Sequence, residues 1–445
     1  MMLHRSSSLT SSPTSSPTSS PTSSPLSNPT GHRRPAGAPR LLSINNYHYP
    51  RGGSDQVYFQ HAALMGDQGW DNAFFSMHHP RNLASEWSDY FVDELEFGHQ
   101  YSAWKKLLMA GRVIYSFEAR RKLRALLDVY RPDVAHVHCL YHHLSPAVLP
   151  VLRERGIPVV LTAHDLKIAC PAYKMLNETG VCERCRDGSV LNVIRYRCVR
   201  ESLSASAVVA AESGLHGLLG TYRRQVNCIV APSRFFLEKF VEWGWPREQF
   251  RYIPNCVDAK RLVPRCEPGD YFLYFGRLAP EKGVGTLLRA AAQAGVPLRI
   301  AGSGPHEARL REIDAQLGQH AQFMGFQSGD ALHALIRGAR AVVLPSEWYE
   351  NAPMSVLESF ALGKPVIGAD IGGIPELIEP DHNGWVFPSG DADALATVLT
   401  RVSALPDARV ADMGRAARAH VVQHFHRAGY LRAMLDLYAE LGVSR

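Results

Sequence analysis

Short β-rich runs alternate with helix-like segments along nearly the whole chain, in two successive sets. This alternation is typical of parallel sheets covered by helices on both faces, because parallel neighbours are joined by crossover connections. The order predicts an α/β protein with two Rossmann-like domains divided near Asn255–Pro268, whose ligand lies between them at the carboxyl ends of the strands. The strand candidates are Leu41–Asn46, Asp71–Phe75, Asp133–His138, Pro158–Ala163, Asn227–Ala231 and Tyr252–Asn255, then Tyr271–Gly276, Leu298–Ala301, Gln322–Phe326, Ala341–Pro345 and Pro365–Gly368.

The first 40 residues differ in composition from the rest of the chain. Ser, Thr and Pro make up 24 of them, and Thr-Ser-Ser-Pro occurs four times in tandem from Thr10 to Pro25. Such a segment buries too little apolar surface to offset its ordering entropy, so we expect residues 1–40 to be a disordered tail. We therefore expect a first domain over 41–262, a second over 263–425 and a terminal helix within 426–445.

The formal net charge of +6 is concentrated in two stretches. Residues 1–50 hold four Arg and no acid, and residues 101–131 hold eight Lys or Arg against two acids. The remaining residues sum to −4, which argues against a general nucleic-acid binder. No stretch approaches the roughly 18–20 unbroken apolar residues of a membrane helix. Eight cysteines in 445 residues make no disulfide scaffold and the amino terminus lacks the apolar core of a secretory signal, so we expect a cytoplasmic protein.

Residues 101–131 carry apolar side chains at helical spacing among basic ones. The apolar set is Trp104, Leu107, Leu108, Gly111, Ile114 and Tyr115, and the basic set is Lys105, Lys106, Arg112, Arg120 and Arg121. A basic amphipathic helix of this kind rests on anionic membrane surfaces. An ordinary domain helix with its apolar stripe in the core gives the same pattern. Two interpretations therefore stay open, peripheral contact with the inner face of a membrane and packing in the core.

The most informative stretch runs from Ser346 to Gly373 and reads SEWYENAPMSVLESFALGKPVIGADIGG. A strand ends before it, a helix begins near Pro353, and Gly363-Lys364-Pro365 ends that helix. The first amides of the helix, those of Met354, Ser355 and Val356, point out of a helix amino terminus and suit an anion. Glu350 and Glu358 flank this terminus, with seven residues between them. An anion that carries hydroxyl-rich groups on both sides would fit here.

In this context the stretch resembles the signature of glycosyltransferase family 4, Glu-x7-Glu followed by small residues and Gly-Lys-Pro-Val. The resemblance covers residues 41–442 and is strongest over 271–390. It implies the GT-B architecture, in which two Rossmann-like domains face a central cleft. In that architecture the first domain binds the acceptor, the second binds the nucleotide sugar, and the last helix crosses back to the first domain. It further implies that Glu350 holds sugar hydroxyls, that Glu358 holds the ribose, and that the donor site also includes Asn351, Met354, Ser355 and Val356.

Two cations follow the strand that ends at Gly276, in the stretch Tyr274–Gly283, YFGRLAPEKG. Arg277 and Lys282 at the mouth of a parallel sheet can hold a diphosphate, Arg through forked hydrogen bonds and Lys as a point charge. They would also stabilise a departing nucleoside diphosphate without Mg²⁺, so we expect no cofactor for catalysis. By themselves both residues would equally suit solvated positions. The resemblance places both at the donor phosphates.

The first half offers weaker signals. Gly52 and Gly53 follow the first strand, and paired glycines permit close backbone approach to a ligand, although they are also common in turns. His164 ends the buried run Val159–Ala163. A lone His after a strand is more often structural, but the resemblance implies that His164 faces the donor sugar. His138 lies on the preceding strand and shares a face with His136. Both are expected to be structural, and contact of His138 with an acceptor is the alternative.

Two loops of the second half bear on the nucleotide. Ala301–Pro305, AGSGP, follows a strand but does not complete Gly-x-Gly-x-x-Gly, because Glu307 stands at the last position. That argues against a dinucleotide oxidoreductase. Phe326 follows Gly325 at the end of the next strand, where the resemblance implies contact with the nucleobase. A core Phe at a strand end is the other interpretation.

Four of the eight cysteines lie within residues 170–198, with the spacing C-x11-C-x2-C-x12-C. Cys182 and Cys185 with the outlying thiols match the ligand count of a tetrahedral zinc site, which would stiffen a loop near His164. Free thiols and a labile disulfide are the alternatives. The zinc ligands of this prediction are Cys170, Cys182, Cys185 and Cys198.

The resemblance implies transfer of a glycosyl unit, with retention of anomeric configuration, from a nucleotide sugar to a glycan, lipid-linked or other hydroxyl acceptor. Cell-surface polysaccharide or glycoconjugate biosynthesis is the expected setting. The residues implied in catalysis are His164, Arg277, Lys282 and Glu350. The alternatives are a nucleotide-sugar hydrolase or epimerase of the same architecture and a non-catalytic nucleotide-sugar-binding protein. A zinc-ribbon nucleic-acid binder would rest on the cysteines alone and conflicts with the charge balance.

Overall fold

The computed structural model describes residues 37–95, 101–177 and 180–443. The predicted tail lies outside the described residues except for its last four positions. The chain from Ala38 onward forms a single compact unit. Within the described residues, no helix combines the length and apolar character needed to cross a membrane.

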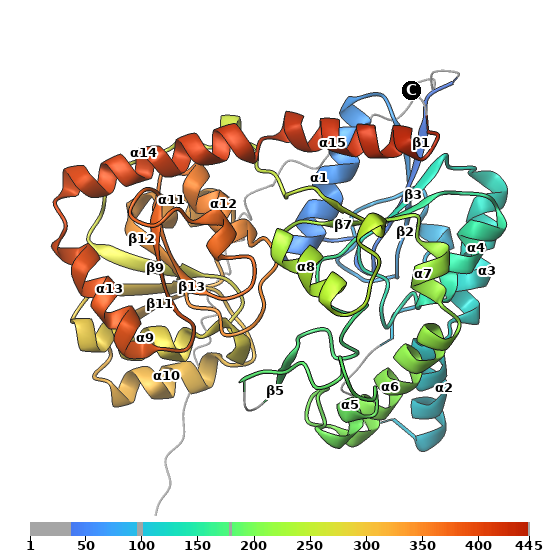
Figure 1. Ribbon diagram of the computed structural model, residues 1–445, viewed down its shortest axis with the longest axis horizontal. Coiled ribbons are helices and arrows are strands. Elements are labelled where there is room, and N and C mark those ends of the chain that lie inside the picture. Colours follow the sequence, from blue (N-terminus) through green and yellow to red (C-terminus); the bar gives the residue numbers. More distant parts are fainter. Residues whose placement is uncertain (1–36, 96–100, 178–179, 444–445) are drawn as a thin grey trace, which may run out of the picture. The chain divides into compact units, whose positions relative to one another are not determined.

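Two six-stranded parallel sheets organise this unit (Figure 1). The first has the strand order β2-β1-β3-β4-β7-β8 and the second β11-β10-β9-β12-β13-β14. The first sheet consists of β1 (Arg40–Ile44), β2 (Asp71–Phe75), β3 (Val134–Val137), β4 (Val159–Thr162), β7 (Cys228–Ala231) and β8 (Phe250–Tyr252). The second consists of β9 (Tyr271–Phe275), β10 (Leu298–Ala301), β11 (Ala321–Gly325), β12 (Ala339–Leu344), β13 (Val366–Asp370) and β14 (Gly384–Pro388). The predicted α/β class with two parallel sheets is confirmed.

The helices lie between the strands in sequence. Those among and after the first-sheet strands are α1 (Gly53–Asp67), α2 (Ala103–Ile114), α3 (Phe117–Val129), α4 (Leu149–Glu154), α5 (Asn192–Arg195), α6 (Leu203–Leu218), α7 (Thr221–Gln225) and α8 (Arg234–Glu242). The later ones are α9 (Val284–Ala294), α10 (Glu307–Gln316), α11 (Gly329–Gly338), α12 (Met354–Ala361), α13 (Ala392–Ala404), α14 (Asp407–His424) and α15 (Arg427–Glu440). A two-strand hairpin, β5 (Leu176–Asn177) with β6 (Gly180–Val181), lies in the cysteine-rich insert.

Strand alternation divides the second half into two cores, one on each face of its sheet. Phe272 and Tyr274 of β9 point to the face covered by α9 and α13. Leu273 and Phe275, the alternate residues, point to the face covered by α12 and α14. Because successive side chains of a strand point to opposite faces, a strand buried on both sides is apolar throughout, as the sequence of β9 is.

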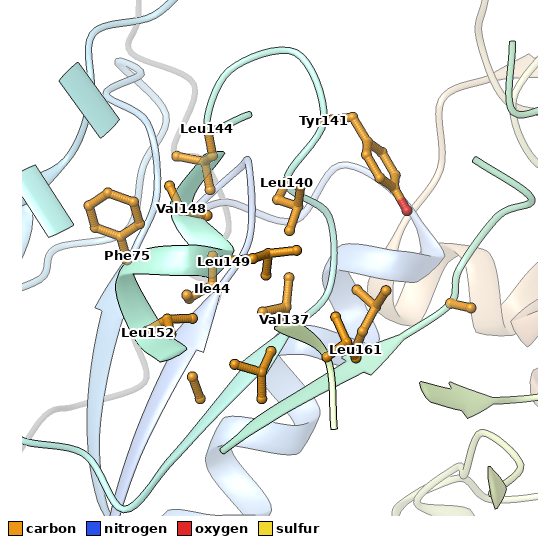
Figure 2. Close-up of a cluster of buried hydrophobic side chains, with 14 of the residues drawn as sticks. Ile44, Phe75, Val137, Leu140, Tyr141, Leu144, Val148, Leu149, Leu152 and Leu161 are labelled. Carbon is orange, nitrogen blue, oxygen red and sulfur yellow. The ribbon is translucent and has the colours of Figure 1, made fainter. Parts of the chain in front are cut away.

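The first sheet is covered in the same manner. Figure 2 shows the larger of its two cores, where Ile44, Phe75 and Val137 pack with leucines of the segment 140–152. The smaller core joins Leu41 and Leu64 to residues of the terminal helix α15, among them Met434 and Leu437. Figure 1 shows α14 beside the second sheet and α15 beside α1. The terminal helix α15 therefore completes the core of the first sheet, although β1 of that sheet begins at Arg40 and α15 begins only at Arg427.

Three sequence expectations differ from the structure. The strand expected at Tyr252–Asn255 is β8, which begins at Phe250 and ends at Tyr252, before Pro254 can interrupt the ladder. Strand β14 was not predicted, because it begins with Gly384 and ends with Pro388, which are typical of turns. Its alternating residues Trp385 and Phe387 are buried in the core. The basic segment 101–131 forms two helices rather than a continuous one, divided at Tyr115 and Ser116.

Candidate functional site

The loop after β12 and the first turn of α12 form the centre of the candidate site. Pro353 caps the helix in an extended conformation, and α12 begins at Met354. The Val356 amide donates to the Pro353 carbonyl at 3.1 Å within this first turn. The anion site predicted from three amides is thereby reduced to those of Met354 and Ser355, while the Val356 side chain is buried in the core under α12.

Glu350 is buried and paired in the loop that precedes α12. Its Oε1 accepts hydrogen bonds from Lys282 Nζ at 2.6 Å and from Ser346 Oγ at 2.7 Å. Burial acts to raise the pKa of Glu350, but Lys282 and the hydrogen bonds outweigh it and hold the pKa below its ordinary value. The carboxylate is therefore ionised at neutral pH, and it fixes the position of Lys282.

Close packing of two loops brings Lys282 to Glu350 although 68 residues separate them. Gly283 adopts a φ of 65°, and a Cβ there would lie 1.8 Å from the carbonyl oxygen of Pro345. Only glycine permits both the left-handed backbone and this approach. The Glu347 amide also donates to the Glu281 carbonyl at 2.9 Å, which ties the turn after β9 to the loop after β12.

Glu358 lies one turn into α12, in different surroundings. Burial raises the pKa of its carboxyl group to about 7, and no cation among the described residues offsets the loss of hydration. The protonated form is therefore favoured more than in an ordinary exposed glutamate. A partly buried carboxyl group of this kind can exchange hydrogen bonds with a polar ligand such as a pair of hydroxyl groups.

Arg277 shares a buried carboxylate with a residue from the first half of the chain. One oxygen, Glu281 Oε1, lies 2.5 Å from Arg277 NH2 and 3.0 Å from Lys174 Nζ. Sequence reasoning anticipated Arg277 but missed Lys174. Nothing in the local sequence marks Lys174, because its partner stands 107 residues further along the chain.

The first half meets this site at three further points. Asn351 donates from Nδ2 to the carbonyl of Ala163, the residue before His164, at 2.7 Å. Ser233, which caps α8, donates to Asn351 Oδ1 at 2.8 Å. A Cβ on Gly53, the first residue of α1, would lie 3.7 Å from Met354 Cγ. Gly53 of the predicted glycine pair thus lies against the start of α12, and Ala163, the residue before His164, lies against the loop that precedes it.

His164 belongs to a group of stacked histidines that extends into the first sheet. Its Nε2 lies 2.9 Å from His138 Nδ1, and His138 stacks on His136, whose Nδ1 contacts the Tyr438 hydroxyl of α15 at 2.5 Å. Burial lowers the pKa of His164 to about 4, so its ring is neutral at pH 7. A neutral ring suits hydrogen bonding and positioning of a ligand rather than proton donation from an imidazolium.

Phe326 lies at the carboxyl end of β11 with 74% of its surface exposed. The interpretation of Phe326 as a core residue is therefore wrong. An exposed aromatic ring beyond a parallel strand, in the same half as Arg277 and Glu358, can stack on a flat ring of a ligand. Contact with a nucleobase stays a prediction.

The four clustered cysteines line one small cavity together. Its volume is about 10 Å³, and its lining includes Val193 and Trp243 besides Cys170, Cys182, Cys185 and Cys198. All four thiols are free, and burial raises the pKa of Cys185 to about 12. Among the described residues no three His, Cys, Asp or Glu side chains converge in metal-binding geometry. The four cysteines thus surround one cavity, and the prediction that they bind zinc is untested.

Two family models match consecutive parts of the chain, between residues 51 and 420. The model for "Glycosyltransferase Family 4" matches residues 51–261, and the model for "Glycosyl transferases group 1" matches residues 263–420. The chain is a member of glycosyltransferase family 4. Each match contains its share of the site, with Gly53 and His164 in the first and Arg277, Lys282 and Glu350 in the second.

Named relatives of this family 4 chain agree with that assignment. It is 38% identical over 303 residues to an uncharacterized glycosyltransferase, MJ1607 of Methanocaldococcus jannaschii, spanning 65% of this chain and 70% of that protein. It is 26% identical over 277 residues to the amylovoran biosynthesis glycosyltransferase AmsK of Erwinia amylovora, spanning 57% of this chain and 68% of that protein. Alignments with these and other curated relatives span 57% to 70% of the relatives' lengths.

The fold also agrees with solved structures. The crystal structure of Alr3699/HepE from Anabaena, in complex with UDP and glucose, superposes with a TM-score of 0.65. At 17% identity the superposition covers 90% of this chain and 99% of that one. The GT-B architecture that the resemblance implied is confirmed.

Proposed function

We propose that this family 4 protein transfers a glycosyl unit from a nucleotide-diphosphate sugar to a hydroxyl acceptor, with retention of anomeric configuration and without a catalytic metal. The observation that carries the proposal is the junction at the start of α12. There the ionised Glu350–Lys282 pair and the first amides of the helix meet Gly53 and the segment that ends in His164. The sugar-diphosphate linkage of a donor bound there would lie between the two halves of the chain.

The surroundings of each side chain support a role in donor binding. The amides of Met354 and Ser355, with Arg277 and Lys282, would bind the diphosphate. Glu358 would exchange hydrogen bonds with the ribose hydroxyls, and Phe326 would stack on the base. Asn351 is held between Ser233 and Ala163, so it would shape the wall beside the sugar rather than bind it strongly.

The proposed reaction needs no general base on the protein. The acceptor oxygen bonds to the anomeric carbon on the face from which the nucleoside diphosphate leaves. The bond from that carbon to the phosphate oxygen breaks, its electron pair stays on the phosphate, and the acceptor proton passes to the same oxygen. Arg277 and Lys282 stabilise the charge that grows there, while Glu350 and neutral His164 orient the sugar.

The acceptor class is proposed from the relatives and from an exposed surface. AmsK is named for amylovoran biosynthesis, which favours a glycan or lipid-linked acceptor. In α2, Trp104, Leu107 and Leu108 are 68%, 62% and 53% exposed, so the core interpretation is wrong for these three residues of the stripe.

Lys105 and Lys106 are exposed beside those apolar side chains. We propose that this face of α2 rests on the anionic inner leaflet of a membrane, which favours Trp and Lys at its interface. In a flotation assay, a large fraction of the protein should float with vesicles of anionic phospholipid, and a smaller fraction should float with vesicles of neutral phosphatidylcholine. Equal flotation with both, or none with either, would contradict the membrane proposal.

The transfer proposal is tested by screening nucleotide sugars for thermal stabilisation and then assaying the best donor with glycan and lipid-linked acceptors. A donor present at about 100 times its Kd adds roughly 2.7 kcal/mol to stability, enough to raise the Tm measurably. Transfer should persist when EDTA is added, and the product linkage should keep the anomeric configuration of the donor. Release of free sugar alone would identify a hydrolase. Immediate inhibition by EDTA that Mg²⁺ or Mn²⁺ reverses would overturn the metal-independent mechanism.

A further inference from the structure

A loop of the first half places a lysine on the phosphate side of the candidate site. Lys174 Nζ lies 3.0 Å from Glu281 Oε1, the oxygen that Arg277 also contacts. The Glu281 side chain is 2% exposed, whereas those of Lys174 and Arg277 are 29% and 53% exposed. The carboxylate is thus enclosed, and the two cations are open to solvent on its outer side.

The loop that carries Lys174 is anchored on both sides. Ala172 and Met175 are buried and line the cavity formed by the four cysteines. The Lys174 amide donates to the Ala172 carbonyl at 2.8 Å, and the Cys182 amide donates to the Met175 carbonyl at 2.8 Å. Lys174 therefore projects from a fixed turn, and its ordering needs little further loss of conformational freedom when a ligand binds.

The charges around Glu281 leave a net attraction for anions. Burial acts to raise the pKa of Glu281, but its backbone hydrogen bond, Lys174 and Arg277 outweigh burial and hold the pKa below the ordinary value. One ionised carboxylate then faces two cations, which leaves one positive charge uncompensated. Lys has three N–H donors and Arg has five, so each can bind Glu281 and a phosphate oxygen at once.

We propose that Lys174 is a donor-binding residue, a third cation that acts with Arg277 and Lys282 on the diphosphate of the nucleotide sugar. Glu281 holds the two cations, Lys174 and Arg277, next to each other before the donor binds, and it keeps its contacts with both when the donor is bound. The inference rests on the proposed function, because the diphosphate belongs to the proposed donor. It adds that the first half of the chain supplies part of the phosphate site.

The test compares Lys174→Gln, Lys174→Arg and the wild type in their affinity for UDP and GDP, for inorganic pyrophosphate and for the bare nucleosides. Loss of a charged hydrogen bond should weaken binding of the preferred nucleoside diphosphate about tenfold or more in Lys174→Gln. Pyrophosphate should lose affinity in the same variant, the nucleoside should not, and Lys174→Arg should retain most of the binding. The salt dependence of nucleotide binding should also become shallower, because one cation is missing.

Lys260→Gln is the matched control, since it removes the same charge from an exposed lysine outside the site. Thermal unfolding of each variant verifies that the fold is intact. Unchanged diphosphate affinity in folded Lys174→Gln would overturn the inference, and so would an equal loss for diphosphate and nucleoside, which would mark Lys174 as a clamp between the halves only. If the wild type binds neither UDP nor GDP, the proposed function itself fails, which is a different result.

Discussion

Glu350 in the loop before α12 and Glu358 in α12 lie eight positions apart in the sequence, but their carboxylates have opposite surroundings. Glu350 in the loop has a cation and a hydroxyl group on the same oxygen, and its pKa lies below the ordinary value. Glu358 in the helix is partly buried, no cation among the described residues offsets that burial, and its pKa is raised to about 7. The two glutamates of the sequence signature therefore differ in charge state and in partners. In the proposed mechanism, ionised Glu350 positions Lys282, and Glu358 binds the ribose of the donor.

The largest loss of transfer rate should come from removing Lys282, the cation that pairs with Glu350 and has no counterpart at Glu358 among the described residues. Lys282→Ala deprives Glu350 of its partner and the departing diphosphate of a positive charge. By analogy with the loss of an oxyanion-hole donor, we expect the rate of transfer to fall on the order of 10²–10³-fold. Single-turnover kinetics at saturating donor measure this loss. Lys260→Ala is the control, and a rate within about threefold of wild type in folded Lys282→Ala would show that Lys282 does not act on the leaving group.

A smaller effect should appear in the pH dependence of nucleotide binding. In the proposed donor complex, ionised Glu358 would accept hydrogen bonds from both ribose hydroxyls, so the wild-type affinity should decline as the pH falls through about 7. Because the phosphates of the ligand also titrate, the quantity to follow is the ratio of wild-type to Glu358→Gln affinity, by titration calorimetry between pH 6 and 8. A constant ratio across this range would refute the ribose assignment or the raised pKa.

The same pKa shift has a consequence for stability. The folded-state pKa of Glu358 lies above its unfolded value, so the protonated carboxyl contributes stability that is present at low pH and is lost as the pH rises through about 7. Glu358→Gln cannot ionise and should therefore unfold at a higher temperature than wild type above pH 7. The gap in Tm should narrow towards pH 5. A gap that widens on acidification would contradict the sign of the shift.

The smallest effect should come from the other end of the chain. The Thr-Ser-Ser-Pro repeats have no core-forming sequence pattern, and the first strand, β1, begins at Arg40. Deletion of residues 1–38 should leave Tm, donor affinity and transfer rate within experimental error of the full chain. Loss of yield or of rate on truncation would assign the repeats a part in folding or catalysis.

Sequence reasoning succeeded where the site is contiguous. Strand, loop, Pro353 and helix follow one another within residues 339–361, so local rules of capping and alternation were sufficient to place Glu350 and Glu358. Local rules also account for the cap of α13, where the Ala394 amide donates to Asp391 Oδ1 at 2.9 Å.

What could not be predicted depends on contacts between distant segments. Lys174 reaches Glu281 through a loop whose course is set by the cysteine cavity, and no pattern within the loop itself signals that course. The contact of His138 with His164 was also not predicted, because it depends on parallel strands β3 and β4 being neighbours in the sheet. The local sequence also did not decide whether Phe326 and Trp104 are buried or exposed, and both are exposed in the structure.

The measurement that tests the account most directly compares Glu350→Gln and Glu358→Ala in parallel. For each folded variant, calorimetry gives the Kd of the nucleoside diphosphate, and single-turnover kinetics with saturating nucleotide sugar give the rate of transfer. The account predicts that Glu358→Ala weakens binding of the diphosphate about tenfold with a modest change in rate, because a charged hydrogen bond to the ribose is lost. It predicts the reverse for Glu350→Gln, which should bind the nucleotide normally and transfer slowly. The proposed roles would be contradicted if both variants lost nucleotide affinity to the same extent, or if both lost transfer rate to the same extent. They would also be contradicted if Glu358→Ala bound the nucleoside diphosphate as tightly as the wild type.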